Sequence, residues 1–124
     1  MKKLLLISLV SVSILKLLAA GINQFDKRNP LTTNDVNQIV QAIYRTEGGE
    51  KTSHPYGVII GKRKFTKEEA KRICENTVRN NYTRWQRSSS TEGFINYLAN
   101  VYCPVSADPK GNANWKKNMK KFLS

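Results

Sequence analysis

Apolar residues recur at helical spacing in several stretches of the chain, separated by polar or glycine-containing segments. The first stretch lies between residues 36 and 44 and follows the i, i+3, i+4, i+7, i+8 pattern of one buried helix face. Its apolar residues are Val36, Ile39, Val40, Ile43 and Tyr44. Thr32, Thr33 or Asn34 can cap such a helix at its start. We therefore predict a helix that ends at Glu47, immediately before two glycines.

Three more helices are expected further along the chain. Thr66-Lys67-Glu68-Glu69 fits a capping box, and apolar residues repeat at helical spacing from Ala70 to Trp85, which predicts a long central helix. The apolar residues after Thr91 predict a third helix that ends at Cys103-Pro104. A loop over residues 105–112 then leads to a short last helix that carries Trp115.

One segment between the first two helices has a different character. Tyr56-Gly57-Val58-Ile59-Ile60-Gly61 places β-branched residues between glycines, which predicts a short strand or hairpin. The fold class expected from the whole pattern is mainly α, with about four to five helices and a short β-element after the first core helix. The length of the chain suits one small domain with a single modest core.

The N-terminal residues have the layout of a secretory signal. A charged start, Met1-Lys2-Lys3, precedes an apolar segment of about a dozen residues and small residues near Ala19 to Gly21. We expect residues 1–20 to be a signal peptide, or an uncleaved anchor because Lys16 interrupts the apolar segment. Residues 21–33 are a polar lead-in, and residues 34–124 form the folded domain. The protein is then exported, periplasmic or extracellular, and tethered to the membrane if the segment is retained.

The charge and the cysteines of the chain indicate an expected partner and an expected cross-link. The chain carries a formal net charge of +12, and removing the three lysines of the signal leaves +9, so an anionic envelope polymer is an expected partner. Cys74 and Cys103 are the only cysteines, and export would place them in an oxidising compartment where thiols pair. We expect one disulfide between them, closing a loop of about 30 residues and contributing about 3 to 4 kcal/mol.

Glu47 is the strongest candidate for a catalytic residue. The predicted helix fixes its position, and the helix-breaking residues Gly48 and Gly49 follow directly, so a cleft can begin there. A carboxyl group partly desolvated there would have a raised pKa, as a general acid at ordinary pH requires. The competing interpretation is a solvated charge beside a plain glycine cap. Glu50, three residues later, is either a partner in the site or a solvated loop charge, the latter being favoured.

Other chemistries find little support in the residues. One histidine, His54, and two cysteines do not supply the ligands of a dedicated metal site, and no elbow motif accompanies His54. Phosphate-loop and dinucleotide fingerprints are absent, so no cofactor is expected. Nucleic acid is not an expected partner, because export and the lack of a recognisable motif argue against it.

Three segments occur in a recognisable order: Ala42 to Gly49, then His54 to Ile59, then Phe94 to Tyr102. Together they resemble the lysozyme-like superfamily, nearest to bacterial soluble lytic transglycosylases. The resemblance implies an α+β lysozyme-like fold in which a helix ends at the catalytic glutamate and a glycine-hydrophobic segment lines a glycan cleft. Carried over by position, Glu47 is the acid/base, Tyr56, Gly57 and Val58 form the cleft wall, and Tyr102 is the tyrosine near the acid.

This resemblance implies an exported enzyme that cleaves peptidoglycan glycan strands as a monomer, either by hydrolysis or by forming an anhydro sugar. The sequence departs from the family pattern at Gly48, at the position after Ile59 and at Cys103, where the family commonly has serine, glutamine and asparagine. The alternative is a non-catalytic cationic cell-wall-binding module on the same scaffold. Tyr56, Tyr102 and Trp85 could stack on sugar rings, but the helical spacing of Trp85 and Trp115 favours a place in the core for both tryptophans.

Overall fold

The computed structural model describes residues 25–124, so the expected signal peptide lies outside the described residues. This part of the chain folds into four α-helices and two single-turn 3₁₀ helices, with no strand among them. The elements are α2 (Thr33–Thr46), η1 (Gly49–Lys51), η2 (Pro55–Gly57), α3 (Lys67–Arg87), α4 (Phe94–Tyr102) and α5 (Pro109–Leu123). The expected mainly α class is confirmed. Over residues 25–124, no helix combines the length and the apolar character that crossing a bilayer requires.

Local capping signals explain where the first two α-helices begin. The Thr32 side chain accepts a hydrogen bond from the Asp35 N–H, and the Asp35 carboxylate accepts one from the Thr32 N–H, which forms a reciprocal capping box. At the start of α3 the Thr66 side chain accepts from the Glu69 N–H, but the Glu69 carboxylate binds Arg63, so only one half of the expected capping box forms. These starts agree with the sequence pattern, whereas α4 begins at Phe94 with Gly93 as its cap, slightly later than expected.

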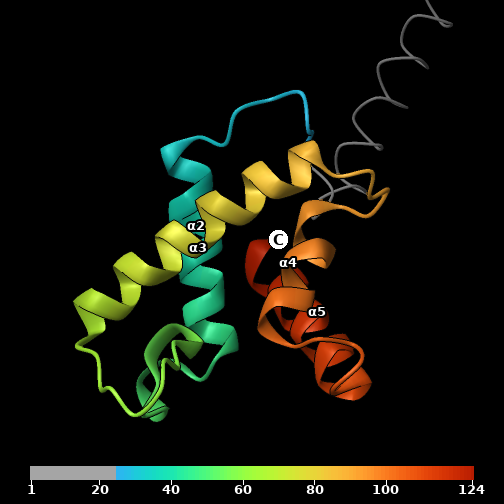
Figure 1. Ribbon diagram of the computed structural model, residues 1–124. Coiled ribbons are helices and arrows are strands. Elements are labelled where there is room, and N and C mark those ends of the chain that lie inside the picture. Colours follow the sequence, from blue (N-terminus) through green and yellow to red (C-terminus); the bar gives the residue numbers. More distant parts are fainter. Residues whose placement is uncertain (1–24) are drawn as a thin grey trace, which may run out of the picture.

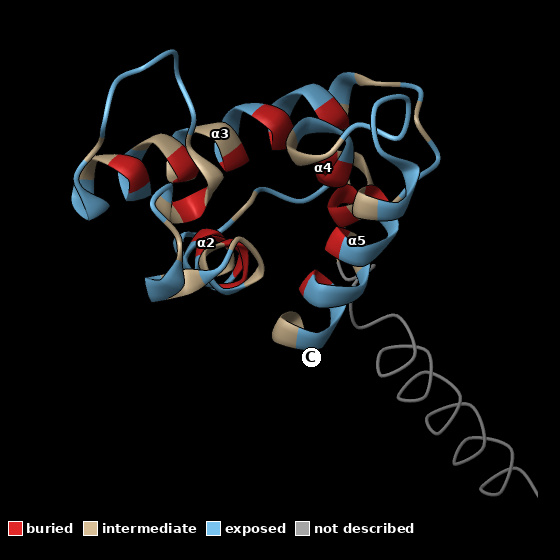
Figure 2. Ribbon diagram, turned by 90° about the horizontal axis from the view of Figure 1, so that it is seen from below, coloured by how far each residue is buried: buried red, intermediate tan, exposed pale blue. Residues whose placement is uncertain are grey.

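The four helices surround one core. In Figure 1, α3 runs across α2, while α4 and α5 lie together to one side. Helix α2 packs against both α3 and α5, and α4 packs against α5 and α3. Figure 2 shows the buried residues of the helices facing the middle of the domain. The largest fully buried side chains include Phe94, Ile39, Ile43, Ile95, Leu98 and Met119.

The last helix is longer than the sequence pattern indicated. Its first residue is Pro109, whereas we expected a loop as far as Asn112. The Asp108 side chain accepts a hydrogen bond from the Gly111 N–H at 2.8 Å and caps the helix. Proline is favoured at the first helical position because its fixed φ suits a helix and its missing N–H is not needed there. The proline and glycine that suggested a loop therefore lie inside the first turn of α5.

The predicted β-element is wrong. Tyr56 and Gly57 have φ values of +60° and +67°, which lie in the left-handed region and not in extended backbone. The Val58 N–H donates to the Pro55 carbonyl at 3.3 Å, so the segment closes a turn on itself and pairs with no strand in the described chain. Residues 58–60 continue as irregular backbone, with Ile59 and Ile60 largely exposed.

The predicted disulfide is also wrong, since both cysteines are free. The buried Cys74 thiol of α3 lies 3.4 Å from the Tyr102 hydroxyl, whereas the Cys103 thiol faces the first turn of α5, 3.9 Å from the Asp108 carbonyl. Neighbouring residues in a helix point about 100° apart around its axis. Tyr102, and not Cys103, is the residue at the end of α4 that points toward Cys74.

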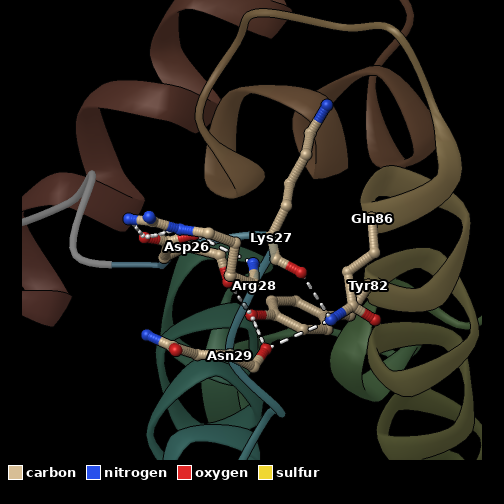
Figure 3. A network of polar contacts seen from close by, with 6 residues as sticks. All are labelled: Asp26, Lys27, Arg28, Asn29, Tyr82 and Gln86. Atoms are coloured by element: carbon tan, nitrogen blue, oxygen red, sulfur yellow. Dashed lines mark hydrogen bonds and ion pairs between the residues drawn. The ribbon is translucent and has the colours of Figure 1, made fainter.

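The described part of the lead-in is bound to α3. The Tyr82 hydroxyl lies 2.9 Å from the Asp26 carbonyl oxygen and 2.8 Å from the Asn29 carbonyl oxygen. The Gln86 amide donates to the carbonyls of Lys27 and Asn29, as Figure 3 shows. The Lys27 ammonium donates to two carbonyls of the loop between α3 and α4. Residues 25–32 therefore follow the surface of the domain in a fixed path.

Candidate functional site

Glu47 lies at the end of α2, where regular helix stops. Its backbone N–H still donates to the Ile43 carbonyl at 2.8 Å, so the helix fixes its Cα. Gly48 follows with a φ of +111°, a conformation that favours glycine, and the chain turns away from the helix axis. The Glu47 side chain is half-buried and directed into the protein, and not outward as a solvated cap would be.

Trp115 of α5 holds this carboxylate. Its indole Nε1–H donates a hydrogen bond of 2.9 Å to Glu47 Oε1, joining residues 68 positions apart in the sequence. Trp115 is itself 5% exposed, so water does not compete readily for this contact. A hydrogen bond to an ionised carboxylate is stronger than one between neutral groups. The contact therefore fixes the direction of the carboxylate.

Gly57 of η2 forms another wall of the acid. A methyl group in place of its hydrogen would lie 2.8 Å from Glu47 Cδ and 3.0 Å from Glu47 Cγ. Only glycine leaves the carboxyl group in its observed place, and its φ of +67° also favours glycine. The predicted glycine-hydrophobic segment thus contacts the acid through its glycine.

Tyr102 and Cys74 complete the surroundings of the acid on the side of α4 and α3. The Tyr102 ring stacks on Trp115 with a centroid distance of 5.3 Å and an interplanar angle of 15°. Its hydroxyl shares a hydrogen bond with the Cys74 thiol. Burial raises the pKa of Cys74 to about 11, so this thiol is protonated and unreactive at neutral pH. Burial also raises the pKa of Tyr102.

The pKa of Glu47 is raised above the ordinary value of a glutamate. Burial is the main cause, because it penalises the ionised form, and the Trp115 hydrogen bond offsets part of this by favouring that form. No acidic neighbour among residues 25–124 contributes to the shift. A carboxyl group in these surroundings stays protonated to a higher pH than a surface glutamate, which is the condition for donating a proton.

The described residues form a shallow groove of about 240 Å³, and Glu47 itself is not among the residues that line it. Gly57 and Tyr102 border both the groove and the surroundings of Glu47, so the acid and the groove share two walls. The other residues that line it are Val58, Ile59, Ile60, Ile73, Thr77 and Val101. Enclosed sites for drug-sized ligands have volumes of roughly 300 to 1,000 Å³, so this hollow suits part of an extended ligand.

The predicted site residues fall into two groups. The structure brings together Glu47, Gly57 and Tyr102, with Val58 in the adjoining groove. Tyr56, expected in the cleft wall, is 3% exposed and packs on Tyr44 with ring centroids 4.9 Å apart, outside the groove.

Glu50 lies outside the groove as well. It is exposed, and its carboxylate accepts hydrogen bonds from the Tyr44 hydroxyl and, at 3.0 Å, from the Lys67 ammonium. Each of these contacts lowers the pKa of Glu50, so its carboxylate is held ionised beside a lysine. This geometry matches the favoured interpretation of Glu50 as a loop charge.

Sequence reasoning gave Trp115 no role beside the acid. Nothing local identifies it, since Trp115 and Trp85 both occur at helical spacing and both are buried. The two tryptophans differ only in their hydrogen-bond partners in the folded protein. The Trp85 indole donates to the Glu92 carbonyl and lies in the core, away from the acid. The long-range packing of α5 on α2 determines which tryptophan meets the acid.

Within residues 25–124, no three side chains of histidine, cysteine, aspartate or glutamate gather closely enough to hold a metal ion. His54 is exposed in the loop before η2. A scan against protein-family models gave no match, and searches of curated proteins and of solved structures also found none. The geometry of Glu47 and its neighbours is therefore the basis for a functional proposal.

Proposed function

We propose that this protein is an exported, lysozyme-like enzyme that cleaves the glycan strands of peptidoglycan, with Glu47 as its general acid and base. The observation that carries the proposal is the placement of Glu47, which is fixed at a helix end, half-buried, held by Trp115 and flanked by two residues, Gly57 and Tyr102, that also line a groove. Its raised pKa supports the same role, because glycosidic cleavage begins with protonation of the leaving oxygen.

The reaction needs one proton to leave the acid and one to return. Protonated Glu47 donates its proton to the oxygen between two amino sugars, the bond from that oxygen to the anomeric carbon breaks, and positive charge develops on the ring. A hydroxyl group then attacks the anomeric carbon, and ionised Glu47 accepts the proton which that hydroxyl releases. The carboxyl group ends the cycle protonated, as it began.

The attacking hydroxyl is proposed to belong to the sugar itself. Most glycosidases use a second carboxylate, either as nucleophile or to activate a water. Within the described residues, no acidic group contributes to the pKa of Glu47, and Glu50, three residues later in the sequence, is bound to Tyr44 and Lys67. Attack by a hydroxyl of the same sugar needs no second carboxylate, because the nucleophile is already positioned. The product would then carry an anhydro ring.

The test compares purified wild-type protein with Glu47→Gln on isolated cell-wall sacculi. Glutamine keeps the size of the side chain and can still accept from Trp115, but it has no transferable proton. We expect wild type to solubilise sacculi and Glu47→Gln to lose activity by at least about a hundredfold, in the range typical of lost acid–base catalysis. Glu92→Gln is the matched control, since Glu92 is an exposed glutamate in the loop before α4. Equal activity of Glu47→Gln and wild type would refute the proposal.

A second candidate, a non-catalytic module that binds anionic wall polymers, is favoured by the outer face of α5. This helix carries five lysines and no acid. Four of these lysines are exposed and lie on the side opposite Trp115, and we call them the α5 lysine face: Lys110, Lys117, Lys120 and Lys121. No ion pair involving this face is present in residues 25–124. Such a cluster attracts polyanions.

Retention on sacculi separates this candidate from the first. If the protein is only a binding module, wild type stays on sacculi at low salt without releasing fragments, and the double change Lys117→Gln with Lys121→Gln weakens retention. Lys62→Gln with Lys64→Gln removes the same charge from an exposed loop and is the control. Equal weakening by both pairs would show that net charge, and not the α5 lysine face, causes retention.

A further inference from the structure

The two carboxylate oxygens of Glu47 have different surroundings. Oε1 accepts the Trp115 indole N–H at 2.9 Å and lies next to Gly57. No hydrogen bond from the described residues reaches Oε2, and none of their buried side-chain oxygens lacks a partner. Oε2 is therefore the accessible oxygen of the pair.

One contact holds the Trp115 ring and another holds the helix that carries it. Its ring stacks on Tyr102, whose hydroxyl is bound to the Cys74 thiol of α3. One turn earlier in α5, the side chain of Asn112 is 1% exposed and donates to the Cys103 carbonyl at 2.7 Å, which fixes α5 against the end of α4. An indole that is stacked on Tyr102 and carried by a fixed helix can hold a hydrogen-bond partner in one orientation.

We infer that Trp115 is a positioning residue for Glu47: it binds Oε1, so that Oε2 is the oxygen that carries and exchanges the proton. The residue that orients the acid thus comes from the last helix of the chain, and not from a second carboxylate. Because Tyr102 also lines the groove, the stacked pair connects the groove wall to the acid. A ligand that moves Tyr102 would then move the donor to Glu47.

The contact can be tested without substrate by following the indole N–H signals of Trp115 and Trp85 in a ¹⁵N–¹H spectrum against pH. A donor bound to a titrating carboxylate changes its shift as the carboxylate ionises. We expect the Trp115 signal to move in one step that disappears in Glu47→Gln. Trp85 is the internal control, because it donates to a backbone carbonyl and its signal should stay in place. A Trp115 signal that ignores pH, or that titrates unchanged in Glu47→Gln, would overturn the inference.

The catalytic part of this role rests on the proposed function, so it needs a separate readout. We expect Trp115→Phe to lower kcat on sacculi about tenfold, to change KM less than twofold, and to move the alkaline limb of the pH profile upward. The limb moves because the lost N–H had favoured the ionised carboxylate. Trp85→Phe also removes a buried indole, but it should leave the pH profile unchanged.

The outcomes separate the two claims. A Trp115 signal that titrates with Glu47 in a protein that cleaves no glycan would leave the positioning contact intact and refute the proposed function. Cleavage by wild type together with an unchanged kcat and pH profile in Trp115→Phe would keep the proposed function and refute the positioning role. If Trp115→Phe does not fold, the titration of the wild type and of Glu47→Gln still decides the contact.

Discussion

Replacing Gly57 with alanine tests the packing around the acid, and Gly61→Ala is a matched control. Gly57 and Gly61 have similar φ values, +67° and +58°, so an alanine at either position bears a similar backbone cost of about 1 to 2 kcal/mol. The two sites differ in their surroundings. A methyl group at Gly57 would lie 2.8 Å from Glu47 Cδ, whereas one at Gly61 would meet no atom within 4 Å.

The excess cost of Gly57→Ala follows from the displacement of Glu47. Because 2.8 Å is too short for two carbon atoms, the carboxyl group must move, and its hydrogen bond from Trp115 is lost. At a pH above the raised pKa of Glu47, where the carboxylate is ionised, a hydrogen bond to this charged group contributes about 1.5 to 3 kcal/mol. We therefore expect Gly57→Ala to lower the free energy of unfolding by about 2 kcal/mol more than Gly61→Ala does.

Urea unfolding of the two variants, followed by circular dichroism, measures this difference. Repeating both substitutions in a Glu47→Ala background supplies the coupling energy, because that background has no carboxyl group to displace. We expect the excess to disappear there. The reasoning is refuted if the two alanine variants are equally stable in the wild-type background, or if the excess persists without Glu47.

Three further predictions follow from contacts elsewhere in the domain. Tyr82→Phe removes a hydroxyl bound to two carbonyls of the lead-in, so it should lower the free energy of unfolding by about 1 kcal/mol and speed hydrogen exchange in residues 25–32. A thiol reagent should find two free thiols, with partly exposed Cys103 reacting in the native protein and buried Cys74 reacting only after unfolding; a mass showing a disulfide would contradict this. Since folding raises the pKa of Glu47, the folded state binds that proton more tightly than the unfolded chain, and stability should fall as pH rises through the folded pKa. Thermal unfolding of Glu47→Gln should lack this decrease, and an identical pH dependence in both proteins would refute the assignment.

Local signals predicted the helices well. The capping residues Thr32 and Thr66 and the apolar periodicity behind them lie within a few positions of the structure they specify, so the sequence alone locates α2 and the start of α3. The start of α5 was missed because Pro109 and Gly111 are frequent in loops, although Asp108 and Pro109 are also a cap and a first helical residue.

The remaining errors of the sequence-based predictions concern the direction of the backbone, the direction of side chains and long-range contacts. The β-branched run after Gly57 favours a strand, but the positive φ values of Tyr56 and Gly57 form a turn that periodicity does not reveal. The pairing of Cys74 with Tyr102, and not with Cys103, depends on which side of α4 faces α3. The contact between Trp115 and Glu47 likewise depends on how α5 packs on α2, which the spacing of residues in the sequence does not indicate.

Mass spectrometry of the fragments that wild type releases from sacculi tests the central claim most directly. If Glu47 is the sole acid and base, wild type should release muropeptides that end in an anhydro sugar, lighter by one water than hydrolysis products, and Glu47→Gln should release none. The claim is contradicted if wild type releases no fragments, or if Glu47→Gln releases the same fragments at the same rate.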